Sequence, residues 1–172
     1  MSCSNISSGF TLDCNDSQGG VDKIFIANGP VESFTEAAGL VSAITVGGSA
    51  IAPADFFEFE VPRQTSSITE TPTPSQENGT LFFDQAVTFY LNKMEAEKRN
   101  QLLLMAQATS MIVVVKDTNG KYWSVGLEKG AYMSGGSTTT GVSYGDRNGY
   151  EIIISGMEKE PMFEVDGSIV EA

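Results

Sequence analysis

Two segments near the middle of the chain alternate between apolar and polar residues, and this alternation constrains the fold more than any other feature. The first segment, residues 57–62, has apolar side chains at every second position: Phe57, Phe59 and Val61. The second, residues 83–92, follows the same period over a longer run: Phe83, Gln85, Val87, Phe89 and Leu91. A period of two is the side-chain period of a β-strand. Each segment is therefore predicted to be a strand with one buried face and one solvent face.

Residues 64–80 join these two predicted strands and are rich in Ser, Thr, Pro and Glu. Pro72 and Pro74 lack a backbone N–H, so we expect no regular β-ladder there and predict a long hairpin loop. A long hairpin exposes unpaired strand edges, which soluble proteins normally cover. The hairpin therefore indicates pairing with neighbouring copies of the chain, and so assembly rather than catalysis.

The remainder of the chain is predicted to complete a single, mainly β domain. The 18 glycines among 172 residues, with abundant Ser and Thr, favour a turn-rich β protein. One helix is expected over residues 92–107, with Asn92 as the N-cap and Glu95 in a capping box. Residues 1–20 are predicted to be an N-terminal arm, and residues 161–172 a flexible acidic tail. Further strands are predicted at residues 23–27, 31–34, 40–46, 111–116, 121–127 and 150–155.

The composition argues against several classes of function. The formal net charge is -12, whereas a protein that binds the phosphate backbone needs a basic surface. With 0 histidines, the chain lacks the commonest general base and a common zinc ligand. No nucleotide-binding or hydrolase motif is present, so no catalytic residue, cofactor or metal site is predicted and the chain is not expected to be an enzyme. Residues 13–17 resemble a calcium loop only faintly, because Gln18 and Ile24 occupy the required Gly and Glu positions.

The two cysteines, Cys3 and Cys14, are close enough in sequence to pair across a hairpin. The N-terminus shows neither the basic nor the apolar region of a secretory signal, so reduced thiols are expected. The longest apolar run, residues 111–115, is too short to span a bilayer, and no membrane partner is expected.

Three carboxylates could share one sheet face if the two alternating segments pair: Glu58, Glu60 and Asp84. A pair of carboxylates can act as acid and base in a hydrolase. A solvated strand face is the favoured interpretation over catalysis. A third possibility is the acidic lining of a passage along which DNA moves without sticking.

Three strings of the sequence resemble tail tube proteins of long-tailed bacteriophages, in particular a group from phages of Bacteroidetes-type hosts. They are SGFTLDCNDSQGGVDKIFIAN (residues 8–28), ENGTLFFDQ (residues 77–85) and GDRNGYEIIISGMEKEP (residues 145–161). The order of elements is also similar: a Gly-rich start, a small strand, a long hairpin, one helix and further strands.

The resemblance implies a β-sandwich or partial barrel with one flanking α-helix. Such subunits pair laterally, usually as hexameric rings, and the rings stack into a tube that conducts DNA into the host. The implied location is the virion tail, assembled in the host cytoplasm, and the implied partners are other copies of the chain and other tail proteins. On this basis the lumen-facing residues are predicted to be Glu58, Glu60, Asp84 and Thr88. The inter-ring loop is predicted to contain Thr69, Glu70, Pro72, Pro74, Glu77 and Asn78.

Two other functions stay open at this point. A neck, baseplate-ring or capsid decoration protein of a phage would form one ring or bind a shell rather than a tube. A carbohydrate-binding β-sandwich would require exposed aromatic platforms, which the sequence does not indicate.

Overall fold

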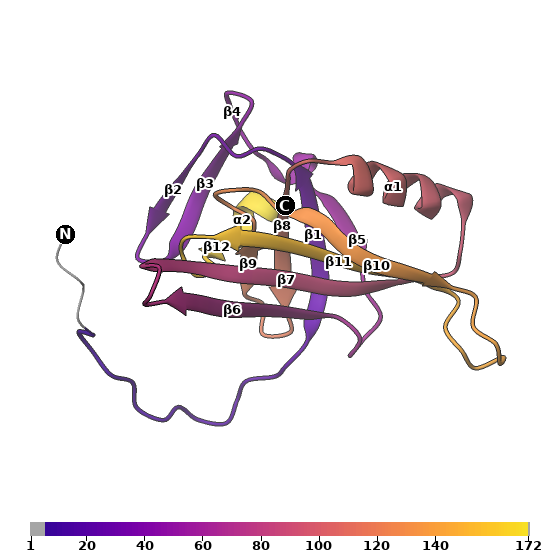
Figure 1. The fold of residues 1–172 in the computed structure, drawn as a ribbon, viewed down its shortest axis with the longest axis horizontal. Helices are drawn as coiled ribbons and strands as arrows, with labels where there is room; N and C mark the ends of the chain where they lie inside the picture. Colours follow the sequence, from indigo (N-terminus) through magenta and orange to yellow (C-terminus); the bar gives the residue numbers. More distant parts are fainter. Residues whose placement is uncertain (1–5, 172) are drawn as a thin grey trace.

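The computed structural model describes residues 6–171, and the fold is mainly β, with two sheets, one α-helix of three turns and shorter helical segments (Figure 1). The larger sheet has eight strands in the order β2-β3-β12-β9-β8-β1-β5, with β4 attached to β3. Its strands are β1 (Val21–Asn28), β2 (Ser33–Ala37), β3 (Leu40–Val46), β4 (Ser49–Ala50), β5 (Phe57–Glu60), β8 (Met111–Asp117), β9 (Tyr122–Val125) and β12 (Glu164–Val165).

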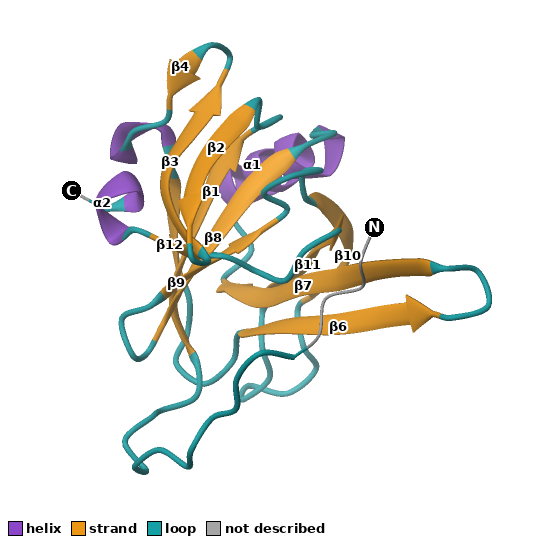
Figure 2. Ribbon diagram, turned by 90° about the vertical axis from the view of Figure 1, so that its left-hand side faces the viewer, coloured by secondary structure: helices purple, strands orange, loops and turns teal. Residues whose placement is uncertain are grey.

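The smaller sheet has four strands in the order β10-β11-β7-β6, all antiparallel. They are β6 (Ser67–Ser75), β7 (Thr80–Asn92), β10 (Tyr132–Thr139) and β11 (Gly149–Glu158). Figures 1 and 2 show that these strands cross those of the larger sheet, with helix α1 (Ala96–Gln107) beside the place where the sheets meet. Within residues 6–171 neither sheet closes into a barrel.

The central strands of the larger sheet are buried on both faces, which explains their continuous apolar sequences. On β1, Ile24 and Ile26 face the core between the two sheets, whereas Phe25 and Ala27 face a second core. Helix α2 (Gly167–Val170) contacts a short 3₁₀ helix (Pro53–Asp55) and contributes Ile169 and Val170 to the second core (Figure 2). The C-terminal segment is therefore needed to close that face of the sheet.

The alternation predicted for residues 83–92 is confirmed by the burial of β7. Gln85, Val87 and Phe89 are buried, whereas Asp84 is exposed. The Phe89 ring lies 6.0 Å from the ring of Phe59 on β5, measured between centroids. This contact between sheets fixes which face of each alternating strand points inward.

The predicted pairing of the two alternating segments is wrong. Strand β5 pairs with β1, and β7 pairs with β6 and β11. The predicted loop over residues 64–80 is mostly strand β6, which forms a tight hairpin with β7 through residues 76–79. Pro72 and Pro74 lie two residues apart in an edge strand, so their nitrogens point in the same direction. That direction is away from β7, towards the open edge of the sheet. The ladder to β7 continues past both prolines.

Four further predictions can be compared with the structure, two of them only in part because residues 1–5 lie outside the described chain. Helix α1 begins at Ala96, not after Asn92, because Asn92 is the last residue of β7; Glu95 is the N-cap and makes no side-chain cap bond. Residues 161–171 are not a flexible tail, since they contain β12 and α2 and bury Val170. Residues 6–20 form no helix or strand and are exposed. Cys14 is exposed and free, whereas Cys3 lies outside the described residues.

Candidate functional site

The outward face of the four-stranded sheet is a polar surface rich in hydroxyl groups, and we call it the hydroxyl face. Cross-strand partners place hydroxyl-bearing and small side chains next to one another: Thr69 beside Ala86, and Ala86 beside Ser155. Further members of this face are Ser67, Thr71, Asp84, Thr88, Tyr90, Ser137, Glu151 and Ile153, together with the exposed Tyr132 and Met157. The opposite face of the same strands packs against the larger sheet, so this face has no covering layer within residues 6–171.

The hydroxyl face carries few charges, and most of them are engaged with one another. Glu151 accepts hydrogen bonds from the Tyr90 hydroxyl at 2.9 Å and from the Ser137 hydroxyl at 2.9 Å. The hydrogen bond to Glu151 raises the pKa of Tyr90 above its ordinary value. The Arg147 guanidinium lies 3.8 Å from the centre of the Tyr90 ring. Asp84 is an exposed carboxylate on this face.

Both edge strands of the four-stranded sheet have a free side. Strand β6 pairs only with β7, and β10 pairs only with β11, among the described strands. Such edges can accept another strand, and proteins that leave them open normally protect them. Pro72 and Pro74 remove two donors from the outer half of β6, whereas residues 67–71 and the whole of β10 contain no proline. The inner half of β6 and the edge of β10 are therefore the places where a neighbouring strand can pair.

The structure separates the four predicted lumen residues into two sets. Asp84 and Thr88 lie on the hydroxyl face. Glu58 and Glu60 lie on β5, in the larger sheet, and point away from Phe59, which faces the core between the sheets. The Glu58 carboxylate pairs with the Lys23 ammonium at 2.9 Å. The prediction that all four form one surface is wrong, and so is the three-carboxylate cluster.

The predicted inter-ring residues also fall into different environments. Thr69, Pro72 and Pro74 are exposed on β6, and Glu77 and Asn78 form the exposed tip of the β6–β7 hairpin. Glu70 differs, because it is half-buried and engaged within its own subunit: its carboxylate accepts hydrogen bonds from the Gln85 amide at 3.1 Å and from the Met162 backbone N–H at 2.6 Å.

Gln85 and Glu70 belong to a buried polar network that attaches the C-terminal segment to the four-stranded sheet. Gln85 is 2% exposed, and its side-chain oxygen accepts a hydrogen bond from the Gly126 N–H at 3.2 Å. Its amide nitrogen also lies 3.5 Å from the Glu160 carbonyl oxygen. Because buried polar groups are costly when unpaired, this network specifies where residues 160–162 cross the sheet.

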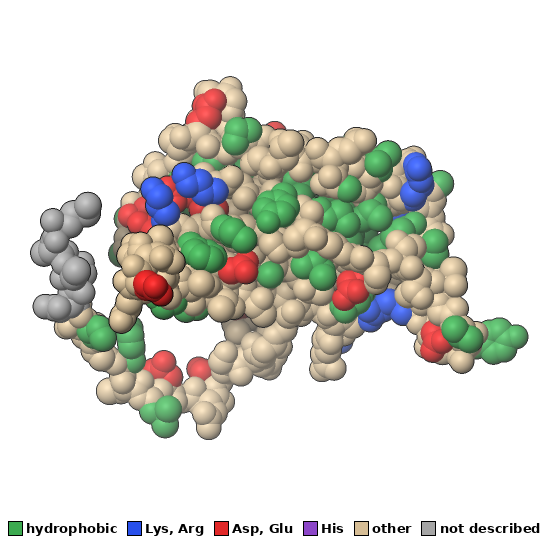
Figure 3. Space-filling model, viewed as in Figure 1, with side chains coloured by type: hydrophobic (Ala, Val, Ile, Leu, Met, Phe, Trp, Pro, Cys, Tyr) green, Lys and Arg blue, Asp and Glu red, His purple; other side chains and the backbone are tan. Residues whose placement is uncertain are grey.

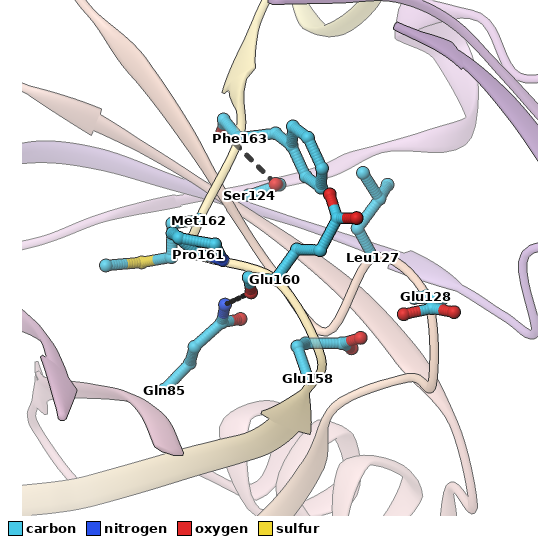
Figure 4. A pocket seen from close by; sticks show the side chains of 9 residues that line it. All are labelled: Gln85, Ser124, Leu127, Glu128, Glu158, Glu160, Pro161, Met162 and Phe163. Carbon is cyan, nitrogen blue, oxygen red and sulfur yellow. Dashed lines mark hydrogen bonds between the residues drawn. The ribbon is translucent and has the colours of Figure 1, made fainter. Parts of the chain in front are cut away.

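Glu158 lies beside this network and is the buried carboxyl group most like a catalytic acid. Burial raises its pKa above the usual range, although the Lys129 N–H donates to the carboxylate at 2.9 Å. The adjoining pocket, lined by Ser124, Glu128 and Phe163 among others, has a volume of about 10 Å³ (Figure 4). That is room for about one water molecule and not for a substrate, so the site supports structure rather than catalysis.

Glu171 joins the end of the described chain to the larger sheet. Its carboxylate accepts hydrogen bonds from the Lys116 ammonium and the Tyr122 hydroxyl, both at 2.6 Å, and from the Lys23 ammonium at 3.1 Å. These three partners, Lys116 first, lower the pKa of Glu171 to about 2. Sequence reasoning missed this contact, because its partners lie 49 to 148 residues away and no local pattern links them.

Residues 6–171 contain no group of three or more His, Cys, Asp or Glu side chains that could hold a metal ion. No helix among them is long and apolar enough to cross a membrane. Acidic side chains on the face seen in Figure 3 are scattered and form no single patch.

No protein-family model matches this chain, and no curated protein is significantly similar to it.

Proposed function

We propose that this chain is the subunit of a bacteriophage tail tube, with a β-sandwich-like fold that assembles into hexameric rings stacked as a hollow tube for DNA. The observation that carries the proposal is the four-stranded sheet with two open edges and an uncovered hydroxyl face. A sheet of this kind is completed when identical sheets join edge to edge around a ring, because closure removes the edges. The resemblance of three sequence strings to tail tube proteins supports the same conclusion.

Lateral pairing would join the inner half of β6 in one subunit to β10 of the next. The β6 contribution is limited to Ser67–Thr71, because Pro72 and Pro74 have no N–H to donate outward. A contact between two different edges is heterologous, and such contacts produce closed rings when the rotation between subunits permits. A ring built this way places every hydroxyl face on the same side.

The hydroxyl face suits the inner wall of a tube through which DNA moves. DNA binding depends mainly on lysine and arginine at phosphates, and this face offers hydroxyls with the carboxylates of Asp84 and Glu151. Its cation, Arg147, is stacked on Tyr90. Glu58 and Glu60 are not part of this wall, since they belong to the other sheet.

Ring stacking would use the two ends of the four-stranded sheet. The β6–β7 turn with Glu77 and Asn78 lies at one end, and the β10–β11 loop projects from the other end (Figure 1). Asp146 organises that loop by accepting hydrogen bonds from two backbone N–H groups, at 2.9 and 2.7 Å. The loop presents Val142 and Tyr144 fully to solvent. Opposite ends with different chemistry allow rings to stack head to tail.

Electron microscopy of the purified chain across a concentration series, beside its mass in solution, tests the proposal. Hollow tubes or stacked rings are expected. Single rings that never stack would instead support a neck, baseplate-ring or decoration role. Failure to form rings at any concentration, also when phage tail initiator proteins are added, would contradict both.

The assignment of the inner wall has its own test. In particles, Asp84→Lys with Thr88→Lys is expected to leave tubes intact and slow DNA ejection, because the new cations bind phosphates. The matched control is Glu60→Lys with Ser49→Lys, which makes the same change in charge at two exposed positions of the other sheet. Normal ejection by the first variant would refute the inner-wall assignment.

A further inference from the structure

The N-terminal arm carries apolar side chains that no part of its own subunit covers. Ile6, Phe10 and Leu12 are 97%, 100% and 101% exposed. Phe10 and Leu12 are two residues apart, so in an extended chain they point to the same side. Figure 3 shows apolar side chains along this arm, away from the body of the molecule. These side chains are therefore available to pack against an apolar surface of a partner.

An apolar groove of matching character lies between α1 and the open edge of the larger sheet. It has a volume of about 140 Å³ and is lined mainly by apolar side chains, among them Phe57, Phe59, Leu104, Met105 and Met111, with the polar Asn28 and Gln101 beside them. Phe57 is 61% exposed and Leu104 is 58% exposed. Both would be covered by an apolar side chain placed in the groove.

The groove runs along strand β5, whose outer edge is unpaired among the described strands. An extended segment can therefore bind there through backbone hydrogen bonds, with alternate side chains entering the groove. The arm sequence fits this requirement over residues 8–12, which contain no proline and no charge. A parallel orientation places Asp13 towards the exposed Arg63, whereas an antiparallel one places it towards Asp55.

The arm is directed away from the groove of its own subunit. Its base is hydrogen-bonded to the β8–β9 turn: Gln18 N–H donates to the Asn119 side chain at 2.9 Å, and the Thr118 hydroxyl donates to the Gln18 carbonyl at 3.0 Å. In the strand order, β8 and β5 lie on opposite sides of β1. The arm therefore leaves the subunit on the side opposite its own β5 edge.

We propose that the arm of one copy adds as a parallel strand to the β5 edge of a second copy and inserts Phe10 and Leu12 into the groove beside α1. Each subunit then gives one arm and receives one, a heterologous contact that propagates through an assembly. In the proposed tube this contact ties neighbouring subunits together independently of β6–β10 pairing. The contact needs only a second copy, so it does not depend on the tube being the assembly formed.

Disulfide capture in the full chain tests the contact, with Cys3→Ser in every protein. A donor chain keeps Cys14, and an acceptor chain carries Cys14→Ser with Arg63→Cys. Mixed under mild oxidation, they are expected to form a disulfide between Cys14 and the thiol at position 63, identified by mass spectrometry. The matched control acceptor carries Cys14→Ser with Lys159→Cys, at a side chain that is 72% exposed outside the groove. We expect about tenfold less product with the control, because docking raises the effective concentration of one thiol near the other.

Equal yields from the two acceptors would overturn the inference. So would an intrachain disulfide in a chain carrying both Cys14 and Arg63→Cys, which would show that the arm binds its own groove. Phe10→Ser with Leu12→Ser is expected to abolish the product, whereas Ser7→Ala with Ser8→Ala is expected to leave it unchanged.

The inference and the proposed function fail in different ways. Normal tubes with no arm-dependent disulfide would refute the inference and leave the tube proposal standing. Arm-dependent dimers or chains without rings would refute the tube proposal and support the inference. A chain that stays monomeric at every concentration and gives no product would refute the arm contact directly.

Discussion

Replacing Gln85 by Glu tests whether the buried network holds the C-terminal segment on the sheet. The two side chains have nearly the same shape, so the change replaces the hydrogen-bond donor of the amide by a carboxylate oxygen with little effect on packing. The side-chain oxygen that accepts from Gly126 N–H is retained. The hydrogen bond to Glu70 is lost, and two carboxyl groups then face each other at the former 3.1 Å separation.

The expected cost of Gln85→Glu depends on pH. At an effective dielectric constant of 20, two charges 3.1 Å apart repel by about 5 kcal/mol. The pair can avoid this repulsion by binding one proton, which then bridges the two carboxyl groups. Holding a proton on a group with an ordinary pKa of about 4.3 costs about 3.7 kcal/mol at pH 7 and about 1 kcal/mol at pH 5, at 1.36 kcal/mol for each pH unit. Because the pKa of the folded pair is raised, stability is lost as pH rises.

Urea unfolding at pH 5, 6, 7 and 8, followed by tryptophan fluorescence, measures this dependence. The free energy of unfolding of Gln85→Glu relative to wild type should fall by about 1.4 kcal/mol for each pH unit up to pH 7. Gln76→Glu is the matched control, because it makes the same exchange in the exposed β6–β7 turn. A penalty that does not change with pH, or one equal to that of the control, would refute the contact between Gln85 and Glu70.

Three further changes follow from the structure. Glu171→Gln should lower the free energy of unfolding at pH 7 by about 1 kcal/mol. The lowering of the Glu171 pKa to about 2 corresponds to a stabilisation of about 3 kcal/mol, which solvent screening of this partly exposed group reduces. That difference should be complete above about pH 4.5 and disappear as pH falls towards 2; a constant difference in thermal unfolding across this window would contradict it. Glu158→Gln should be more stable than wild type in urea unfolding at pH 7, and this advantage should be smaller at pH 5. The reason is that burial raises the pKa of Glu158, so ionisation of its carboxyl group destabilises the folded wild type. Equal stability of the two proteins at both pH values would show that the carboxylate is not desolvated. Phe89→Ala removes a fully buried ring and should cost about 3–5 kcal/mol in chemical unfolding, and a loss below about 1 kcal/mol would show that the sheets do not pack through it.

Local pattern predicted the strands but not their partners. The alternation in β7 and the apolar runs of β1 and β8 depend only on which faces are buried, and these were predicted correctly. Pairing depends on contacts between distant segments, so nothing in the sequence of β5 shows that its partner is β1. The predicted acidic surface failed for this reason alone.

Elements without a strong local signal were missed. Strand β10 contains Gly135 and Gly136, which are poor strand formers, and it exists because it pairs with β11. The tail was predicted to be flexible from its acidic composition, yet Glu171 is held by Lys23, Lys116 and Tyr122. In both cases tertiary contacts outweigh local preference. The hydroxyl face and its edges were predicted only in part: Asp84 and Thr88 followed from the alternation in β7, whereas the open edge of β10 did not.

The prolines that suggested a loop have a different physical role, and it bears on assembly. In an edge strand, a proline whose nitrogen points outward blocks pairing by a neighbour without disturbing the ladder on its other side. Pro72 and Pro74 do this along the half of β6 nearest the β6–β7 turn. The two edges of the four-stranded sheet are therefore unequal, since β10 has no such block. In the proposed ring, a neighbouring strand would be restricted to Ser67–Thr71, which would prevent uncontrolled edge-to-edge growth and leave one short, defined register available. The hairpin tip beyond the prolines is left free for contacts along a different direction.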